Sequence, residues 1–457
     1  MATHLTGSAQ HPATGHRSAS RLSPAGWGLA ATFVLMVAAM AVPAVTGWSV
    51  HVKSFPPLHA DWEPRLGWGT APATVLAVLT ARWAVGLAER LQWRWLLACA
   101  FALGLAWMLA LAFVDGAHGV DHILGTQYEY LRTARATTDL HATLQEYVGR
   151  IRQTRAHYWP THIAGHPPGA LAFFVVLVRL GLGSGLAAGL VVSAVAATTA
   201  VAVLIAVRTL GAEQMARRAA PFLTVGPAAV WQSVSADAMF AATAAWGIAF
   251  LALAATRHQG SAAVGWSVLA GLLLGYCAML SYGLPLLGIL ALAVLVVARS
   301  WTPLPVTVVA ALAVVVMFGV FGFSYVDALP AIHDRYWGAI GGRRQATYWL
   351  WGDLAALAFS AGPVAFAGVA HVTAGVRGYL GDARSRVVVW LSGGGVAMVL
   401  MADASLMSKA EVERIWLPFE PWLLLSCALL PPAWRRRGLV LQVALALSVQ
   451  HLLFTGW

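Results

Sequence analysis

Charged residues are scarce in this sequence: they make up 10% of its 457 residues, whereas hydrophobic residues make up 59%. Soluble domains carry about 25% charged residues, so this balance excludes a water-soluble globule. Long apolar runs of Ala, Leu and Val follow one another from Gly26 onward, without the alternation that is typical of strands. A helix needs roughly 20 apolar residues to cross a bilayer core of about 30 Å. The composition therefore predicts an all-α polytopic membrane protein.

Cysteine and lysine are also rare. Cys99, Cys277 and Cys427 all lie inside apolar runs, which argues against disulfides and against a cysteine metal site. Lys53 and Lys409 are the only lysines, so arginine carries nearly all of the net charge of +11. In a membrane protein such an excess of positive charge reflects the orientation of the chain and contact with anionic lipid, rather than binding to nucleic acid. Arginine also favours the bidentate recognition of phosphate and carboxylate.

Hydropathy predicts about thirteen transmembrane helices. They are expected at 26–48, 68–87, 94–114, 168–207, 218–235, 237–256, 263–281, 283–299, 303–325, 349–375, 387–404, 415–431 and 438–456. Segment 168–207 is long enough for two helices, and Gly181, Gly183 and Gly185 mark a break within it. We interpret 1–25 as a disordered cytoplasmic tail, 26–93 as an N-terminal transmembrane hairpin and 94–457 as the main transmembrane domain.

Arginine positions predict the orientation. Counted from either end of the chain, the basic turns fall on one side if segment 168–207 crosses the membrane once or three times, and the positive-inside rule assigns that side to the cytoplasm. The N-terminus is then cytoplasmic, and segments 49–67, 115–167, 326–348 and 405–414 lie outside a plasma membrane. Segment 115–167 is the only long polar segment between spans, and loops of that size are usually functional. Its spacing predicts one or two amphipathic helices at the interface, with an apolar stripe that includes Tyr130, Leu144 and Ile151.

Acids, histidines and arginines cluster at the predicted outer boundary, whereas the cores of the spans are nearly free of carboxylates. Polar residues at membrane depth are costly, so their positions indicate function. Ion-coupled transport favours acids at the midplane and paired broken helices, neither of which the sequence indicates. A lipid-linked substrate fits better, with its phosphate at arginine. The clusters are Asp115, His118, Asp121, His122 and Glu129; His157, His162 and His166; Asp237; His333, Asp334, Arg335, Arg343 and Arg344; and Lys409, Glu411, Glu413 and Arg414.

At these residues the sequence resembles the GT-C superfamily of membrane glycosyltransferases, in particular the branch of protein O-mannosyltransferases and lipid A aminoarabinose transferases. The resemblance covers about residues 94–430. It rests on Val114-Asp115-Gly116, Tyr128-Glu129-Tyr130-Leu131, Gly165-His166-Pro167-Pro168-Gly169, Arg217-Arg218 with Pro221 and Pro227, Ser235-Ala236-Asp237, and Glu411-Val412-Glu413-Arg414-Ile415-Trp416. Two features depart from it: segment 26–87 precedes the matching part, and Asp115 and Asp121 are six positions apart rather than contiguous.

The resemblance implies inverting transfer of a sugar from a polyprenyl-phosphate donor to a glycan, lipid or protein acceptor of the cell envelope. One carboxylate would take the acceptor proton, and cations would stabilise the departing phosphate. Asp115 is the first candidate for the base, with Asp121 as the substitute. The candidate substrate-binding residues are Glu129, His162, His166, Asp237, Arg335, Arg343, Arg344, Lys409, Glu413 and Arg414, of which Arg414 is the first choice for the donor phosphate.

Structural roles stay open for each of these residues. Asp115 and Asp237 are equally suited to capping helix ends, and Asp237 to pairing with Arg414. Local ion pairs in a solvated loop are the alternative for Lys409–Arg414.

No cofactor is required by the sequence, the histidine spacing does not fit zinc, and a divalent cation between Asp115, Asp121 and the phosphate is left open. The rival functions are a transporter or flippase for a lipid-linked substrate and a non-catalytic membrane assembly subunit.

Overall fold

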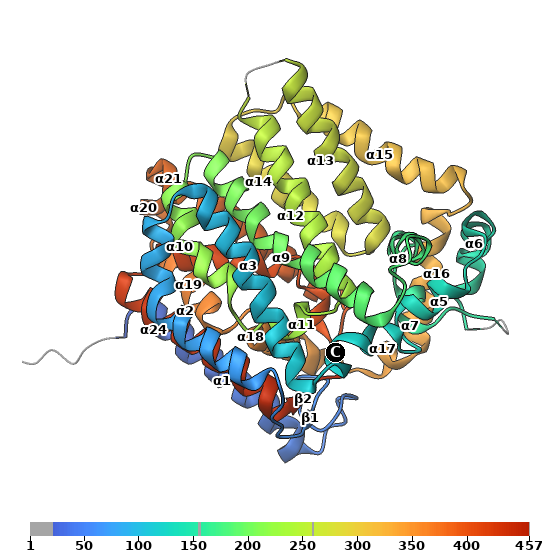
Figure 1. Cartoon of the computed structure of the whole chain (residues 1–457), viewed down its shortest axis with the longest axis horizontal. Coiled ribbons are helices and arrows are strands. Elements are labelled where there is room, and N and C mark those ends of the chain that lie inside the picture. Colours follow the sequence, from blue (N-terminus) through green and yellow to red (C-terminus); the bar gives the residue numbers. More distant parts are fainter. Residues whose placement is uncertain (1–21, 154–156, 258–259, 457) are drawn as a thin grey trace, which may run out of the picture.

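The computed structural model describes residues 22–153, 157–257 and 260–456, and these residues are almost entirely helical (Figure 1). Residues 1–21 of the expected tail lie outside the described part. The long helices are α1 (Pro24–Thr46), α2 (Thr70–Arg90), α3 (Trp93–Ala112), α9 (Gly185–Thr209), α12 (Ala236–Ala255), α13 (Ser261–Leu280), α15 (Leu304–Val320), α21 (Ala383–Ala404) and α24 (Pro432–Leu452).

Shorter helices complete the body. They are α8 (Gly169–Arg179), α10 (Glu213–Thr224), α11 (Ala229–Gln232), η4 (Leu284–Leu286), α14 (Leu287–Ala298), α16 (Tyr325–Gly338), α17 (Ile340–Arg343), α18 (Ala346–Ser360), α19 (Pro363–Ala374), α20 (Val376–Gly381), α22 (Val412–Ile415), α23 (Glu420–Leu424) and η5 (Leu425–Leu429). Strands β1 (Asp61–Trp62) and β2 (Leu453–Phe454) pair antiparallel.

The predicted class, an all-α membrane protein, is confirmed. Among the described residues, seven helices are long and apolar enough to cross a membrane, or nine if each of two bent pairs counts as one span. Three shorter apolar helices bring further hydrophobic segments, so the expected number of thirteen spans is not reached by length and composition. Segment 168–207 divides at its glycines into α8 and α9, as the sequence indicates.

Three expected spans are broken instead of continuous. Segment 218–235 divides between α10 and α11 at residues 225–228. Segment 349–375 forms α18 and α19, which meet at an angle of 108°. Gly362 at this break has φ +81°, a conformation that glycine adopts without steric cost. Segment 415–431 begins at the last residue of α22 and contains α23 and η5. Hydropathy did not predict these breaks, because the stretches around them are mainly apolar, although Gly226-Pro227 and Gly362-Pro363 are turn signals at two of them.

The buried centre of the protein is α12, which packs against α9, α13 and α14. Helix α1 packs on α18 and α19, whereas α2 lies with α3, α10 and α24. The first two helices are therefore part of the main helical body. Ser23 begins α1 by accepting the Gly26 amide at 3.2 Å, and Gly47 ends it in a left-handed conformation.

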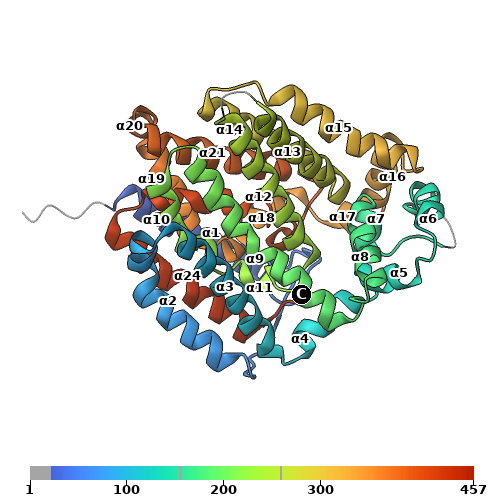
Figure 2. The ribbon, with the colours of Figure 1, turned by 45° about the horizontal axis from the view of Figure 1, so that its top comes forward.

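The described part of segment 115–167, which we call the outer loop after its predicted side of the membrane, forms a chain of short helices at one end of the molecule. These are η1 (Phe113–Asp115), α4 (His118–Asp121), η2 (Ile123–Gly125), α5 (Tyr130–Ala136), α6 (Leu140–Glu146), η3 (Val148–Arg150) and α7 (Thr161–Gly165). Figures 1 and 2 place α5, α6 and α7 beside α16, at the opposite end from α20. Tyr130, Leu144 and Ile151 of the expected stripe are buried in the protein core rather than exposed to lipid.

Candidate functional site

The candidate site is centred on Arg414 of α22, which is buried against the outer loop. Its Nη1 donates to Glu129 Oε1 at 2.9 Å, and its Nη2 donates to His162 Nε2 at 3.1 Å. His162 Nδ1 lies 2.8 Å from the same Glu129 oxygen. Because a guanidinium only donates, His162 Nε2 must accept, so Nδ1 carries the ring proton and donates to Glu129. Three side chains thus close a ring of charge-assisted hydrogen bonds.

A second arm of the network runs through Asp237. Arg414 Nε lies 3.2 Å from Asp237 Oδ2, and Asp237 Oδ1 lies 3.9 Å from His166 Nε2. His166 Nδ1 lies 2.8 Å from both the His162 carbonyl and the Tyr130 hydroxyl. The Tyr130 ring is stacked on Phe174 of α8. We call this set, Glu129, Tyr130, His162, His166, Asp237 and Arg414, the outer network.

Two loops that hold the outer network contain non-glycine residues in the left-handed region. Val234 has φ 58° just before α12, where Ser235 accepts the amide of Asp237. Ala410 and Glu411 have φ 67° and 61° just before Arg414, and Ala410 donates its amide to Asp353 at 2.8 Å. Such conformations cost about 1–3 kcal/mol and persist only where the surroundings impose them. The backbone at both acidic and basic ends of the network is therefore held in place at an energetic cost.

Electrostatics keep the network ionised. Burial raises the pKa of Glu129, but the hydrogen bond from His162 and the positive charge of Arg414 outweigh burial and bring the pKa to about 2. Burial lowers the pKa of Arg414, but Asp237 and Glu129 outweigh it and raise the pKa above its usual value. Burial also lowers the pKa of His166, which favours the neutral ring. The network is thus an ion pair assembly with neutral imidazole beside it.

Glu413, the neighbour of Arg414, behaves differently. Its side chain is 1% exposed, and its Oε2 has no hydrogen-bond partner among the described residues. Burial and the charge of Glu411 raise its pKa to about 7. Glu413 is therefore the carboxyl of this loop whose charge changes near neutral pH.

Of the other predicted cations, most are bound to the protein itself. Arg344 donates to the Lys409 carbonyl at 2.6 Å and to Glu411 at 3.2 Å, and Lys409 Nζ donates back to the Arg344 carbonyl at 2.8 Å. Arg335 donates to the carbonyls of two outer-loop residues, Ile151 and Trp159. Arg343 is exposed and has no side-chain partner within the described ranges.

The two predicted bases are not part of the outer network. Asp115 pairs with Arg65 and accepts Gln450 Nε2 at 2.9 Å, so both of its oxygens are occupied. Asp121 is exposed, packs over Gly185 at the start of α9, and has no side-chain partner in the part of the chain that the structure describes. Together they do not fit the divalent cation considered above, because Arg65 and Gln450 already use the oxygens of Asp115. The described residues hold no group of three or more His, Cys, Asp or Glu suited to a metal ion.

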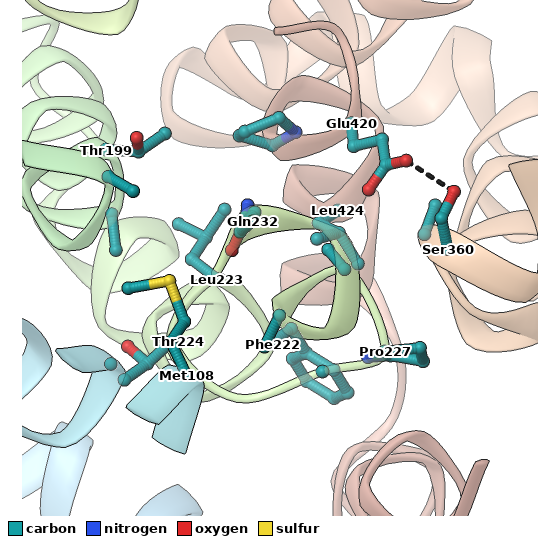
Figure 3. A pocket seen from close by; sticks show the side chains of 18 of the residues that line it. Met108, Thr199, Phe222, Leu223, Thr224, Pro227, Gln232, Ser360, Glu420 and Leu424 are labelled. Carbon is teal, nitrogen blue, oxygen red and sulfur yellow. Dashed lines mark hydrogen bonds between the residues drawn. The ribbon is translucent and has the colours of Figure 1, made fainter. Parts of the chain in front are cut away.

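A small polar cavity lies where three helix breaks meet. Its volume is about 30 Å³, enough for about two water molecules, and residues at the α10–α11 break, the α18–α19 break and the start of α23 line it. Figure 3 shows Glu420 hydrogen-bonded to Ser360, with Gln232 and Thr199 on other sides of the cavity. Glu420 Oε2 and Thr199 Oγ1 are buried without partners among the described residues. The sequence interpretation missed Glu420, although an acid between Phe419 and Pro421 inside an apolar run was a visible signal.

Comparisons with known proteins found similarity to solved structures alone. No protein-family model matches the chain, and no curated protein matches it. The chain is similar to the crystal structure of ArnT from Cupriavidus metallidurans in the apo state, with 18% sequence identity and a TM-score of 0.46. The similarity covers 73% of this chain and 60% of ArnT, so the chain spans less than two thirds of that protein.

Proposed function

We propose that the protein is an inverting membrane glycosyltransferase that moves a sugar from a polyprenyl-phosphate donor to a cell-envelope acceptor on the extracytoplasmic side of the plasma membrane. The observation that supports it is the outer network. Glu129, His162 and His166 of the outer loop, Asp237 at the start of α12 and Arg414 of α22 belong to three separate parts of the chain, yet they form one buried cluster. The same three parts carry the motifs that resemble the glycosyltransferases.

In this proposal the reaction forms a bond between the acceptor oxygen and the anomeric carbon. The bond from that carbon to the donor phosphate breaks, and its electron pair leaves with the phosphate. A carboxylate takes the acceptor proton. Asp121 suits this role better than Asp115, because Arg65 and Gln450 occupy the oxygens of Asp115.

The cations divide between two roles. Arg414 is paired with two buried acids, Glu129 and Asp237, and donates to His162, so we assign it to positioning these groups rather than to the phosphate. Arg343, exposed and without a protein partner in the described part, is the better candidate for the donor phosphate. A guanidinium there would stabilise the negative charge that develops on the leaving group.

The test uses purified protein in nanodiscs with a panel of radiolabelled polyprenyl-phosphate sugars and envelope acceptors. Release of polyprenyl phosphate would identify the donor. Asp121→Asn is expected to lower the rate about 10²–10⁴-fold with donor binding retained, and Arg343→Gln is expected to weaken donor binding. Glu146→Gln, which changes a 68% exposed acid of α6, is the matched control. Absence of turnover with every donor would contradict the whole proposal. Full activity of Asp121→Asn would contradict the choice of Asp121 as the base.

A transporter or flippase is the second candidate, and the cavity at Glu420 favours it. Broken helices around a buried acid are typical of transporter binding sites. In liposomes with a fluorescent polyprenyl-phosphate lipid, a transporter would move the lipid between leaflets, and Glu420→Gln would slow the movement. A glycosyltransferase would release polyprenyl phosphate without moving lipid, and Glu420→Gln would leave that release largely intact.

A further inference from the structure

The end of α2 far from the outer loop carries two adjoining hollows. Helix α2 starts beside Asp115, where the Gly69 amide donates to the Phe113 carbonyl at 2.9 Å, and its 21 residues rise about 30 Å to Arg90. That rise equals the hydrocarbon thickness of a bilayer. The Arg90 end of the first hollow therefore lies near the opposite membrane face from the proposed reaction, and the second hollow extends from there along α2 as far as Leu76. The inference below does not depend on that reaction.

The first hollow is basic. It has a volume of about 360 Å³ between α2 and α24, and its polar lining comes from Arg82, Arg90 and Arg436. All three arginines are exposed, and none forms an ion pair within the described ranges. The nearby acid, Glu89, is already neutralised by Arg435 at 2.7 Å. Three uncompensated guanidinium groups thus face one space.

The second hollow is apolar. It has a volume of about 450 Å³ and lies between α2, α3 and α10, lined by side chains such as Leu76, Leu79 and Leu103. Trp83 and Leu87 line both hollows, so the two spaces adjoin across the exposed ridge of α2. Trp83 is 49% exposed and the Arg82 guanidinium lies 5.7 Å from its ring, an arrangement suited to the membrane interface.

The helices around the two hollows are held together by contacts that do not involve these three arginines. Arg217 Nη1 donates to the carbonyls of Ala88 and Leu91 at 3.1 and 2.7 Å, which ties α10 to the turn between α2 and α3. The Glu89–Arg435 pair ties α24 to the same turn. Neither contact uses the three free arginines, so those arginines are not needed to hold the helices together.

We propose that this composite site binds a glycerophospholipid with an anionic headgroup. Its phosphate would meet Arg82, Arg90 and Arg436, and an acyl chain would lie in the groove between α2, α3 and α10. Guanidinium groups recognise phosphate oxygens by paired hydrogen bonds. A neutral lipid would leave the positive charges uncompensated, and a soluble anion would leave the apolar groove open. A lipid that is charged at one end and apolar at the other satisfies both hollows.

Photocrosslinking tests the proposal on the full-length protein in nanodiscs. The probe is phosphatidylglycerol with a diazirine in its acyl chain, and phosphatidylcholine with the same chain is the reference. Crosslinks are expected on the wall formed by Thr70–Arg90 and Trp93–Ala112, in excess for phosphatidylglycerol. The test variant replaces Arg82, Arg90 and Arg436 together by Gln. Each arginine that is lost should weaken binding of phosphatidylglycerol about fivefold.

The matched control replaces Arg257, Arg299 and Arg377, three exposed arginines outside the hollows, by Gln. This variant has the same net charge as the test variant and should crosslink like the unchanged protein. Equal crosslinking of the two lipids, or equal loss in both triple variants, would overturn the proposal. Displacement of the probe by polyprenyl phosphate but not by unlabelled phosphatidylglycerol would overturn it as well, because the occupant would then be the donor lipid.

Discussion

Arg414 and Glu129 are 285 positions apart in the sequence, yet Arg414 Nη1 donates to Glu129 Oε1 across 2.9 Å in a buried setting. Each side chain is about 5% exposed, so water cannot take the place of the opposite charge if one partner is removed. Removing one member of a buried pair leaves an uncompensated charge, which costs about 3–5 kcal/mol. The pair therefore couples the outer loop to the last third of the chain.

We expect Glu129→Gln and Arg414→Gln each to destabilise the protein by about 3–5 kcal/mol, measured by thermal unfolding in detergent. The double variant should be less destabilised than the sum of the two, because it removes both charges together. Arg152→Gln and Asp334→Asn form the control cycle, since that pair is 45% and 57% exposed and should be worth about 0–1 kcal/mol. Additive effects in the buried cycle would show that the pair is not coupled in the folded protein.

Glu413 should make stability depend on pH near neutrality. Burial and the charge of Glu411 raise its pKa from 4.5 to about 7 in the folded protein. Between these two values the folded state binds more protons than the unfolded state, so the contribution of Glu413 to stability is full below about pH 4.5 and is lost as pH rises to about 7.

The measurement compares melting temperatures of the unchanged protein and of Glu413→Gln between pH 5 and 8. Glu413→Gln should remove part of the decline and be relatively more stable at pH 8. Glu129 acts in the opposite direction, since its pKa of about 2 gives a contribution that is lost only as pH falls below about 4.5. Identical pH profiles for both proteins would refute the assignment to Glu413.

Individual residues show which features of the structure could be predicted from the sequence. The pairing of Asp237 with Arg414 was foreseeable, because an acid and an arginine at one membrane boundary must each find an opposite charge. The division of 168–207 was foreseeable from its glycines. The break in 349–375 was missed because hydropathy carries no information on helix direction, although the dipeptide Gly362-Pro363 is a turn signal at the position of the break. Arg65 and Gln450 were missed as partners of Asp115 because the contact joins segments 50 and 335 positions away.

Asp115 and Arg65 provide a test of structural against catalytic roles. Arg65 also donates to the Leu453 carbonyl at 2.7 Å, so the pair ties the outer end of α3 to the β1–β2 region. We expect Asp115→Asn and Arg65→Gln to lower the melting temperature by similar amounts, with little further loss in the double variant. Loss of glycosyl transfer in Asp115→Asn alone, with its melting temperature and Arg65→Gln activity unchanged, would instead assign Asp115 to the chemistry.

The bend between α18 and α19 depends on Gly362. Its φ of +81° is strained for any residue with a Cβ, and a Cβ at this position would collide with the Gln442 side chain. Gln442 in turn donates to the Ala361 carbonyl at 2.8 Å, so it satisfies a backbone group that the break leaves open. We therefore expect Gly362→Ala to destabilise the protein by more than 1 kcal/mol, as judged by thermal unfolding.

Gly393→Ala in α21 is the control for this prediction. An added Cβ there meets no atom within 4 Å, and the residue has ordinary helical backbone angles. The control should be neutral or stabilising by about 0.5–1 kcal/mol, because alanine is the better helix former. If the two variants melt alike, the break at Gly362 does not constrain the fold. A loss confined to Gly362→Ala would show that the junction beside the Glu420 cavity is fixed by backbone geometry that only glycine accommodates.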